Sequence, residues 1–567
     1  MIENPILPGF NPDPCICRRG EDYYLAVSTF EWLPGIPVFH SRDLKHWELI
    51  THILSDEQVD LKKLPSAKGL WAPCLTYCEE EGLFCLVYGV MNSMNARYFD
   101  VDNFLITASD ICGPWSEPVY LHSAGFDASM LHDGDGKKYI VSLQWETRDN
   151  YNKPGPICLA EYDPEKRAVV GYPKPIWYGA TDRGCLEAPH LTKRGEYYYL
   201  MCAEGGTGYN HCVTMARSKS VYGPYESDPR GPLLTSNPGE FSERGDIDHL
   251  KPRHYNPRAP LQKAGHGSYV DLPNGETYLV YHCARPFVPE LRCTLGRETA
   301  IQKMEWTDDG WLRMAGGGCL ARAATEEPAL PPAPVQEPVS FDGFDGKELE
   351  KFYYAPRVMP ESFADLQVRP GWVRLKGQES LSSLNKVSLL ARKLTAVNSR
   401  ITVKMDFNPE IPQHTAGLTL YYDNMDYFSL EKYYSETLGG QALLVTVMEN
   451  GKRSQCLEER TLVKPGAPLF LRLHVDGRES WFEWSYDGEA FAKIGPVHDT
   501  GKLSDEYCTY GEFTGTMAGI FCVDRMYRRH YADFDFFCCD RFKPSGGPCD
   551  RRLSAVFSPV GNRSAWS

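Results

Sequence analysis

Apolar and polar positions alternate in short runs through the first 280 or so residues, and the alternation recurs as one repeated unit. Each copy opens on a polar or small residue and continues into a short apolar run. It breaks at a turn rich in glycine and acidic residues, then resumes in a second run with an aromatic and aliphatic centre. Charge and glycine between two alternating apolar runs predict a β-hairpin. The five copies are DPCICRRGEDYYLAVST from residue 13, APCLTYCEEEGLFCLVYG from 72, DASMLHDGDGKKYIVSLQ from 127, EAPHLTKRGEYYYLMCAEG from 187 and HGSYVDLPNGETYLVYHC from 266.

Each hairpin is followed by third and fourth strand-like segments, so the repeat is a four-stranded unit that starts again after about 55 to 80 residues. One such sheet cannot bury both of its faces, whereas a closed ring of five sheets can. The sequence therefore predicts a five-bladed β-propeller whose innermost strands line a central channel. The residues that open the copies would meet at one end of this channel; they are Asp13, Trp71 with Ala72, Asp127, Glu187 and His266.

The remaining chain predicts a second all-β domain. The β-propeller is expected to span residues 1–325, and the proline-rich segment 326–338 is expected to be a semi-rigid linker. Alternating patterns such as SRITVKMDF and AGLTLYYD then predict a β-sandwich, a concanavalin-like jelly roll, over residues 339–540. The segment 541–567 lacks periodicity and is expected to be a flexible extension.

Composition and net charge exclude some classes of partner and favour others. A chain of 567 residues needs at least two domains, and its aromatic content of 12% suits both β-structure and the stacking of sugars on rings. The net charge of −15 gives no electrostatic reason to bind nucleic acid or an anionic membrane. No window approaches the roughly 18 to 20 apolar residues of a membrane span. Nucleic acid and membranes are therefore not expected among the partners.

The cysteines indicate a reducing compartment. The 19 cysteines are scattered, and the N-terminal segment MIENPILPGFNPDP lacks the basic and apolar regions of a signal peptide. Many thiols without a secretion signal favour the cytoplasm; export with disulfides is the alternative. Cys74 with Cys78, or Cys15 with Cys17, could be imagined as metal ligands, but the paired spacings typical of zinc sites are missing. The sequence therefore disfavours a metal site.

Three carboxyl groups in one polar, aromatic pocket are suited to cleaving a glycosidic bond. One carboxylic acid must protonate the leaving oxygen, and one carboxylate must activate water or attack the sugar. A third carboxylate can keep the acid protonated by repulsion. Taken singly, each residue has an ordinary interpretation, because Asp between prolines is most often a turn residue. The shared position in the repeat favours catalysis, since a non-catalytic carbohydrate-binding propeller would not need all three.

At these residues the chain resembles glycoside hydrolase family 43, specifically its two-domain β-xylosidases. The motifs that carry the resemblance span residues 4 to about 306 in order; they include GFNPDPCI, STFEWLPGIPVFHSRDL, LWAPCLTY, GFDASMLHDGDGKKY, LEAPHLTKRGEYYYLMCAEGGTGYNH, LQKAGHGSYV and LGRETAIQKMEW. GEFTGTMAGI resembles the family's C-terminal sandwich. The acid motif usually reads E-G-P-H, whereas Ala188 stands here in place of the glycine, and the segment between Pro286 and Cys293 is shorter than in many relatives.

The resemblance implies roles for individual residues. Asp13 matches the general base, Glu187 the general acid, and Asp127 the residue that tunes and orients the acid. The other matched positions are Phe30, Trp71 and Trp145 as aromatic walls, Thr207 beside the next subsite, Arg297 as a ligand of sugar hydroxyls, His266 as a channel histidine near a water-coordinated divalent cation in some relatives, and Phe513 as an aromatic residue that the sandwich inserts over the pocket.

The resemblance implies an inverting exo-β-1,4-xylosidase that releases xylose from the non-reducing end of xylo-oligosaccharides. An α-L-arabinofuranosidase, or one pocket with both activities acting also on arabinosylated xylo-oligosaccharides, is the alternative. No cofactor is required for this chemistry, although His266 leaves open a calcium or other divalent cation in the channel. Relatives of this type are often homodimers or homotetramers. Retaining propeller hydrolases of fructosides open instead on W-x-N-D-P-N-G and carry an E-C acid motif, which this chain lacks.

Overall fold

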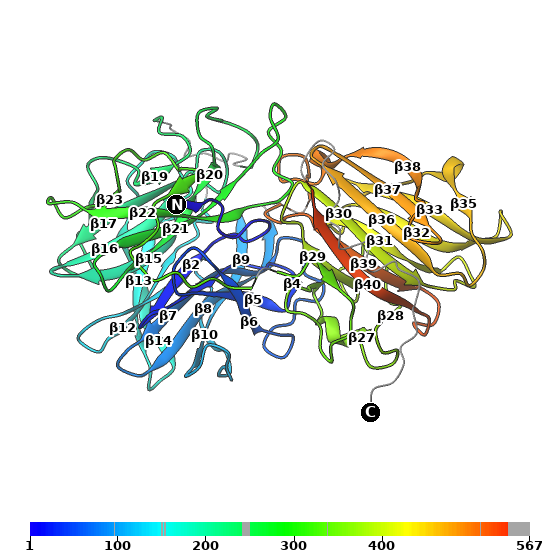
Figure 1. Cartoon of the computed structure of the whole chain (residues 1–567). Helices are drawn as coiled ribbons and strands as arrows, with labels where there is room; N and C mark the ends of the chain where they lie inside the picture. Colours follow the sequence, from blue (N-terminus) through cyan, green and yellow to red (C-terminus); the bar gives the residue numbers. More distant parts are fainter. Residues whose placement is uncertain are drawn as a thin grey trace.

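The computed structural model describes residues 1–95, 97–148, 151, 155–240, 250–336, 338–510 and 512–542. Within these ranges the regular elements are β-strands, apart from three short 3-10 turns at Pro360–Ser362, Leu457–Glu459 and Thr500–Lys502. The strands form two bodies that lie side by side, a propeller drawn in blue to green and a sandwich drawn in yellow-green to red (Figure 1). The expected all-β architecture is therefore confirmed.

Five antiparallel sheets form the blades of the propeller. Their strands are β2 (Cys15–Arg19), β3 (Asp22–Ala26), β5 (Gly35–Ser41) and β6 (Glu48–Leu54) in blade 1; β7 (Gly69–Cys78), β8 (Leu83–Asn95), β9 (Tyr98–Ala108) and β10 (Val119–His122) in blade 2; β11 (Ser129–His132), β12 (Lys138–Leu143), β13 (Ile157–Asp163) and β14 (Ala168–Trp177) in blade 3; β15 (Glu187–Arg194), β16 (Tyr197–Glu204), β17 (Cys212–Ser218), β18 (Glu226–Ser227) and β19 (Leu234–Thr235) in blade 4; and β20 (Gln262–Asp271), β21 (Thr277–Ala284), β22 (Glu298–Trp306) and β23 (Leu312–Met314) in blade 5.

Each blade buries both of its faces against its neighbours. Separate apolar clusters fill the gaps between successive blades; that between blades 5 and 1, for example, contains Leu25 and Val280. This two-sided burial explains why strands such as β12 and β16 are buried at nearly every position rather than at alternate ones. A four-stranded sheet is thus stable here because the ring supplies a partner for each face.

The start of the chain closes the ring. Strand β1 (Ile2–Glu3) pairs with β24 (Ala324–Thr325), and Leu7 bridges to Thr299 in the last blade. The Asn11 backbone N–H then donates to the Arg297 carbonyl at 2.9 Å. Because the first segment is fastened to blade 5, the strand that follows places Asp13 beside residues from the far end of the propeller sequence.

The second body is a sandwich of two antiparallel sheets whose inward residues alternate with outward ones. In β36, for example, Leu469, Leu471, Leu473 and Val475 are buried at every second position. One sheet contains β25 (Phe341–Asp342), β27 (Ala364–Asp365), β28 (Val373–Lys376), β30 (Asn398–Asp406), β36 (Leu469–Asp476), β37 (Glu479–Ser485), β38 (Ala492–Asp499) and β40 (Tyr531–Arg541). The other contains β29 (Ser388–Lys393), β31 (His414–Asp423), β32 (Asp426–Ser435), β33 (Gly440–Glu449), β34 (Lys452–Gln455), β35 (Thr461–Leu462) and β39 (Met517–Asp524). Most of the predicted C-terminal extension, residues 543–567, lies outside the described residues.

The two bodies share backbone pairing. Strand β26 (Ala355–Pro356) pairs with β4 (Trp32–Leu33) of the propeller. The buried Arg357 side chain donates from Nε to the Leu64 carbonyl at 2.6 Å, which extends this contact. The sandwich is therefore joined to the propeller by backbone and buried polar contacts rather than by the connecting segment alone.

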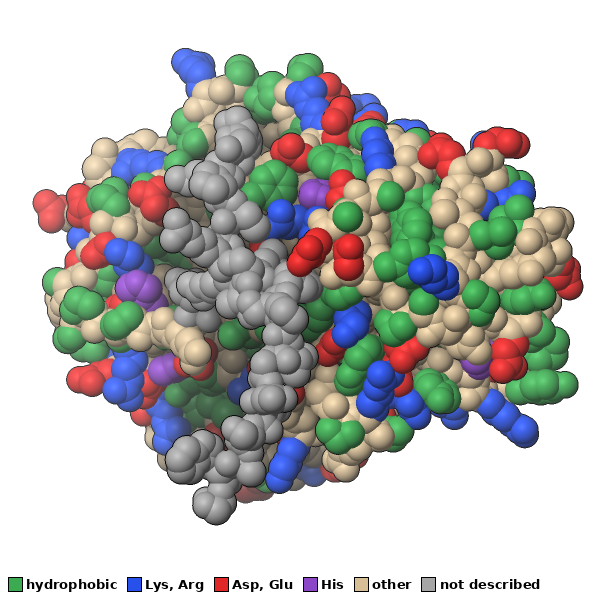
Figure 2. Space-filling view, turned by 45° about the vertical axis from the view of Figure 1, so that its right-hand side comes forward, with side chains coloured by type: hydrophobic (Ala, Val, Ile, Leu, Met, Phe, Trp, Pro, Cys, Tyr) green, Lys and Arg blue, Asp and Glu red, His purple; other side chains and the backbone are tan. Residues whose placement is uncertain are grey.

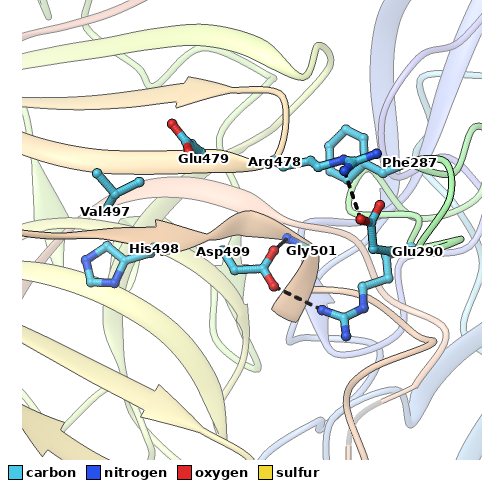
Figure 3. A pocket seen from close by; sticks show the side chains of 9 residues that line it. Phe287, Glu290, Arg478, Glu479, Val497, His498, Asp499 and Gly501 are labelled. Atoms are coloured by element: carbon cyan, nitrogen blue, oxygen red, sulfur yellow. Dashed lines mark hydrogen bonds and ion pairs between the residues drawn. The ribbon is translucent and has the colours of Figure 1, made fainter.

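A second contact lies at the segment between Pro286 and Cys293, where propeller and sandwich bound a cavity of about 420 Å³ (Figure 3). Arg478 pairs with Glu290 at 2.8 Å, and Arg292 pairs with Asp499 at 3.1 Å. These pairs are largely exposed, so each contributes little to stability. The cavity is not lined by any of the residues predicted to act in catalysis.

Acidic and basic side chains are interspersed over the face shown in Figure 2. Within the described part of the chain, no helix has the length and apolar character needed to cross a membrane.

Candidate active site

Five residues at the mouths of the inner strands share an unusual backbone conformation. Their φ angles are positive: Asp13 55°, Ala72 39°, Asp127 54°, Ala188 51° and His266 45°. A residue with a Cβ is strained there by about 1–2 kcal/mol. Register shifts follow at the same level in β7, β15 and β20. Such irregularities re-aim side chains, and repeating them around the ring directs the opening residues into one space.

Asp13 is buried and surrounded by donors. Arg297 Nη1 donates to its Oδ1 at 2.7 Å, His282 Nδ1 lies at 3.3 Å and His266 Nδ1 at 3.6 Å from the same oxygen. Burial alone would raise the pKa of Asp13, but the Arg297 charge, the His282 hydrogen bond and both imidazoles lower it far below the ordinary value. Asp13 is therefore a carboxylate at neutral pH and is suited to accept a proton from water.

Glu187 and Asp127 have the opposite electrostatics. Burial first, and then the charges of Asp127 and Asp13, raise the pKa of Glu187 well above its usual value. Burial and the Asp13 charge raise the pKa of Asp127 to about 8, although Asp127 Oδ2 accepts the Ala188 N–H at 3.0 Å, a bond that favours its ionised form. Burial together with the neighbouring carboxyl groups therefore favours the protonated form of Glu187, which can donate its proton. The Glu187 side chain is 16% exposed against 8% for Asp13, so the protonated carboxyl is the one a leaving group can reach.

A histidine pair links the base to the acid. His282 Nε2 lies 2.8 Å from His211 Nδ1, and His211 Nε2 faces Glu187 Oε1 at 3.7 Å. Burial, the first cause in each case, lowers the pKa of both imidazoles, so both are neutral. Because His282 donates from Nδ1 to the Asp13 carboxylate, its Nε2 accepts from His211. This leaves the buried Nε2 of His211 as a bare lone pair, which favours the protonated form of Glu187.

Aromatic rings form the walls of the site. Trp71, Phe30 and Phe513 contact one another: the Trp71 ring centroid is 5.8 Å from that of Phe30 and 5.7 Å from that of Phe513, and the two phenyl rings are stacked at 6.5 Å. Trp145 lies on a second wall, stacked on Phe99 at 3.9 Å. Phe126, 5.6 Å from Trp71 and 5.7 Å from Trp145, joins the two walls. The predicted wall residues are thus brought together, and Phe30 and Phe513 lie against Arg297, the partner of Asp13.

Phe513 comes from the sandwich and is held by both bodies. Its backbone N–H donates to Asp505 at 3.0 Å, and its carbonyl accepts from Arg297 Nη2 at 3.2 Å. The buried Lys263 of the propeller pairs with Glu506 at 2.6 Å next to this anchor. At Gly515 a Cβ would lie 2.7 Å from the Leu295 carbonyl oxygen, so only glycine permits this close approach. The sandwich therefore supplies one wall of the propeller's site.

Arg297 organises the polar side of the site. Its Nη1 also donates to Thr207 Oγ1 at 3.0 Å, and its guanidinium lies 5.7 Å from the Phe30 ring centroid and 5.6 Å from that of Phe513. Its buried Nε has no hydrogen-bond partner within the structure. A buried donor of this kind is costly when unpaired.

The sequence reasoning did not single out four residues that the structure adds to the site: His211, His282, Phe99 and Phe126. His282 closes the fifth repeated hairpin, and His211 follows the GGTGYN motif. Neither residue opens a copy of the repeat, so the position in the repeat does not identify them. Phe126 directly precedes Asp127 and could have been found by examining neighbours of the opening residues.

The residues around His266 offer few direct ligands for a calcium ion, so such an ion would have to be held mainly through water. Donor atoms of Asp13, His266 and His282 lie within 4.8 Å of one another, yet they offer a single carboxylate, whereas calcium takes six to eight oxygen ligands. The cationic Arg297 already occupies the same oxygen of Asp13 and would repel a second cation. The chemistry described here therefore needs no step through a metal.

Comparisons with known proteins agree with this geometry. The model of glycosyl hydrolases family 43 matches residues 2–312, and that of the beta xylosidase C-terminal concanavalin A-like domain matches residues 341–540. Xylosidase/arabinosidase 43B of Humicola insolens is 38% identical, covering 97% of this chain and 99% of its own. The beta-xylosidase of Bacillus subtilis strain 168 is 38% identical, covering 94% and 99%. The crystal structure of xylan beta-1,4-xylosidase from Bacillus halodurans C-125 is 40% identical with a TM-score of 0.89, covering 95% of this chain and 100% of that one.

Proposed function

Because the chain belongs to glycosyl hydrolase family 43, we propose that this glycoside hydrolase is an inverting, exo-acting β-1,4-xylosidase that removes xylose from the non-reducing end of xylo-oligosaccharides. The observation that carries the proposal is the contrast between an ionised Asp13 and a protonated Glu187 at one channel mouth. Asp127, which touches the backbone next to Glu187, is the residue that sustains this contrast.

The reaction proceeds in one displacement. Asp13 takes a proton from a water molecule while the water oxygen forms a bond to the anomeric carbon. The bond between that carbon and the leaving oxygen breaks, and the Glu187 proton passes to the leaving oxygen. Attack from the face opposite the leaving group inverts the anomeric configuration. Arg297 and the aromatic walls hold the sugar in the orientation that this geometry requires.

Exo-action rests on Phe513, which lies across one side of the site and is anchored in the other domain. In this proposal residues 1–325 are the catalytic domain, 326–338 the linker, and 339–540 a sandwich that caps the site. The substrates are short xylo-oligosaccharides with or without arabinosyl branches, and subunits associate as dimers or tetramers. Light scattering after size-exclusion chromatography measures the association directly.

Arabinofuranosidase activity is the second candidate, supported by a relative named for both activities. A substrate panel distinguishes them: β-1,4- and β-1,3-linked xylobiose, arabinosylated xylo-oligosaccharides and arabinan fragments. Preferential release of xylose from β-1,4-xylobiose is expected. A strong preference for arabinan would replace the xylosidase assignment with the arabinofuranosidase one.

The catalytic assignments are tested by isosteric amides. Glu187→Gln and Asp13→Asn are each expected to lower kcat by about 10²–10⁴-fold or more while the fold is retained. Proton NMR of the first-formed sugar is expected to show the α-anomer from a β-xyloside. Appearance of the β-anomer first would reject Asp13 as a base that activates water.

Catalysis in this family does not use a cofactor. We propose a cytoplasmic location, because 18 cysteines in the described ranges are free thiols and most of these are buried, which suits a reducing compartment. Cell fractionation with antibody detection tests the location, and recovery from the culture medium would contradict it.

A further inference from the structure

The channel has a second layer of side chains directly below the catalytic residues. This layer is formed by the residue two positions after each left-handed residue. Neighbouring members of this layer contact one another across blades; Ser268 Oγ, for example, lies 3.9 Å from Cys15 Sγ. The five members are Cys15 in β2, Cys74 in β7, Ser129 in β11, His190 in β15 and Ser268 in β20.

Three members of this layer offer metal-ligating atoms at one point. Cys15 Sγ, Cys74 Sγ and a ring nitrogen of His190 all lie within 4.8 Å of one another, and Cys74 Sγ is 4.0 Å from His190 Nδ1. Ligands of a tetrahedral zinc ion, with Zn–S near 2.3 Å and Zn–N near 2.0–2.1 Å, stand about 3.5–3.8 Å apart. Side-chain shifts of about 1 Å or less therefore bring the three atoms into coordination.

The charges of a zinc ion and of these three ligands would also cancel. Both cysteines are buried, and a neutral imidazole at His190 has a lone pair with which to coordinate a metal. A dication with two thiolates and a neutral imidazole carries no net charge, so the complex can be buried without an unpaired ion. Asp13 is paired with the cationic Arg297, whereas the hydrogen-bond partners described for the Cys15 thiol are uncharged: the Leu75 carbonyl at 3.5 Å, the Ser268 hydroxyl and the Cys74 thiol.

We propose that Cys15, Cys74 and His190 form a Zn²⁺ site in the second layer of the propeller channel, with water or the hydroxyl of Ser268 as the fourth ligand. Binding releases the two thiol protons to solvent and forms two Zn–S bonds and one Zn–N bond. The ion joins blades 1, 2 and 4 across the channel, so it stabilises the closed ring in the way that a cross-link would. It takes no part in the hydrolytic steps.

The test uses the full-length protein. Metal analysis of protein purified without chelator, followed by calorimetric titration of chelator-treated protein with Zn²⁺, is expected to give one zinc per chain and a higher Tm in the zinc-bound form. Cys15→Ser with Cys74→Ser is expected to abolish both effects. Cys283→Ser, which removes a buried thiol from β21 in blade 5, is the matched control and is expected to bind zinc as the wild type does.

Cobalt substitution keeps the proposal testable even if the double variant does not fold. Co²⁺ in the wild-type protein is expected to show the near-ultraviolet thiolate-to-metal band and the intense visible bands of tetrahedral coordination with sulfur ligands. Absence of binding in the wild type, absence of the thiolate band, or unchanged stoichiometric binding in a folded Cys15→Ser/Cys74→Ser variant would each overturn the assignment. Because every readout is binding or spectroscopy, failure here is distinguishable from failure of the hydrolase proposal.

Discussion

Replacing Arg297 with methionine separates its two roles. The side chain donates to the buried Asp13 at 2.7 Å, and the resemblance to the family also assigns it to the hydroxyl groups of the sugar. Methionine retains an unbranched apolar stem and removes the charge. Asp13 then keeps its burial but loses the strongest influence that lowers its pKa.

The size of the effect follows from the ion pair. Removing one partner of a buried pair costs about 3–5 kcal/mol, and each pKa unit corresponds to about 1.36 kcal/mol, so the pKa of Asp13 should rise by roughly 2–4 units. The base works only when ionised. The acidic limb of kcat/KM against pH should therefore move to higher pH by a similar amount.

The loss of the Asp13–Arg297 pair should also lower the stability of the protein, and this loss should depend on pH. In the wild type the depressed pKa of Asp13 contributes stability that is present above its unfolded value, about 3.9, and is lost as pH falls towards the folded pKa. In Arg297→Met that contribution disappears, so the difference in Tm between variant and wild type should be largest at neutral pH and should shrink in acid.

The assay is stopped-time hydrolysis of an aryl β-xyloside across acidic to alkaline pH. Arg297→Lys keeps the charge and should retain most of the wild-type acidic limb. Arg285→Met removes the 2.7 Å partner of the buried Glu298 in the same blade without touching Asp13, so it should destabilise the protein and leave the limb in place. An Arg297→Met limb that coincides with the wild type while kcat/KM falls would show that Arg297 binds sugar only.

Four other changes test neighbouring features. Phe513→Ala should lower kcat/KM by about tenfold, mainly through KM, because it removes an aromatic wall and leaves the carboxyl groups in place; steady-state kinetics with xylobiose check this. His211→Gln places an amide donor near Glu187, which favours the carboxylate, so the alkaline limb of the pH profile should move to lower pH; an unmoved limb would contradict the lone-pair argument. Ala188→Gly relieves a φ of 51° and should raise Tm by about 1–3 °C with activity retained, as measured by calorimetry. Adding Ca²⁺ to chelator-treated protein should leave kcat unchanged at 25 °C; restored activity would show that a cation acts beside His266.

The repeated pattern predicted the propeller because it is local: each hairpin signals itself through its own turn and alternation. The carboxyl groups could be predicted to converge because they stand at or next to the same place in the repeat: Asp13 and Asp127 are the left-handed residues of their blades, and Glu187 directly precedes the left-handed Ala188. His282 could not, since it lies on a second strand and reaches Asp13 only after β1 and β24 close the ring. The two-residue pairing of β26 with β4 leaves no pattern in the sequence at all.

The cluster of Cys15, Cys74 and His190 could not be predicted from the sequence either. Spacing rules for metal sites compare residues close in sequence, and neither Cys15 with Cys17 nor Cys74 with Cys78 satisfies them. The ring instead brings Cys15 and Cys74 together from different blades, at equivalent depth in the channel. In a propeller the relevant spacing is the blade period, so ligand pairs should be sought between copies of the repeat.

The insertion of Phe513 between Arg297 and Trp71 has a consequence for how this chain can vary. A domain that supplies a wall to its neighbour's site is no longer an independent module, because changes in its loop alter substrate selection directly. Exchanging the sandwich for that of a relative would therefore transplant specificity along with stability.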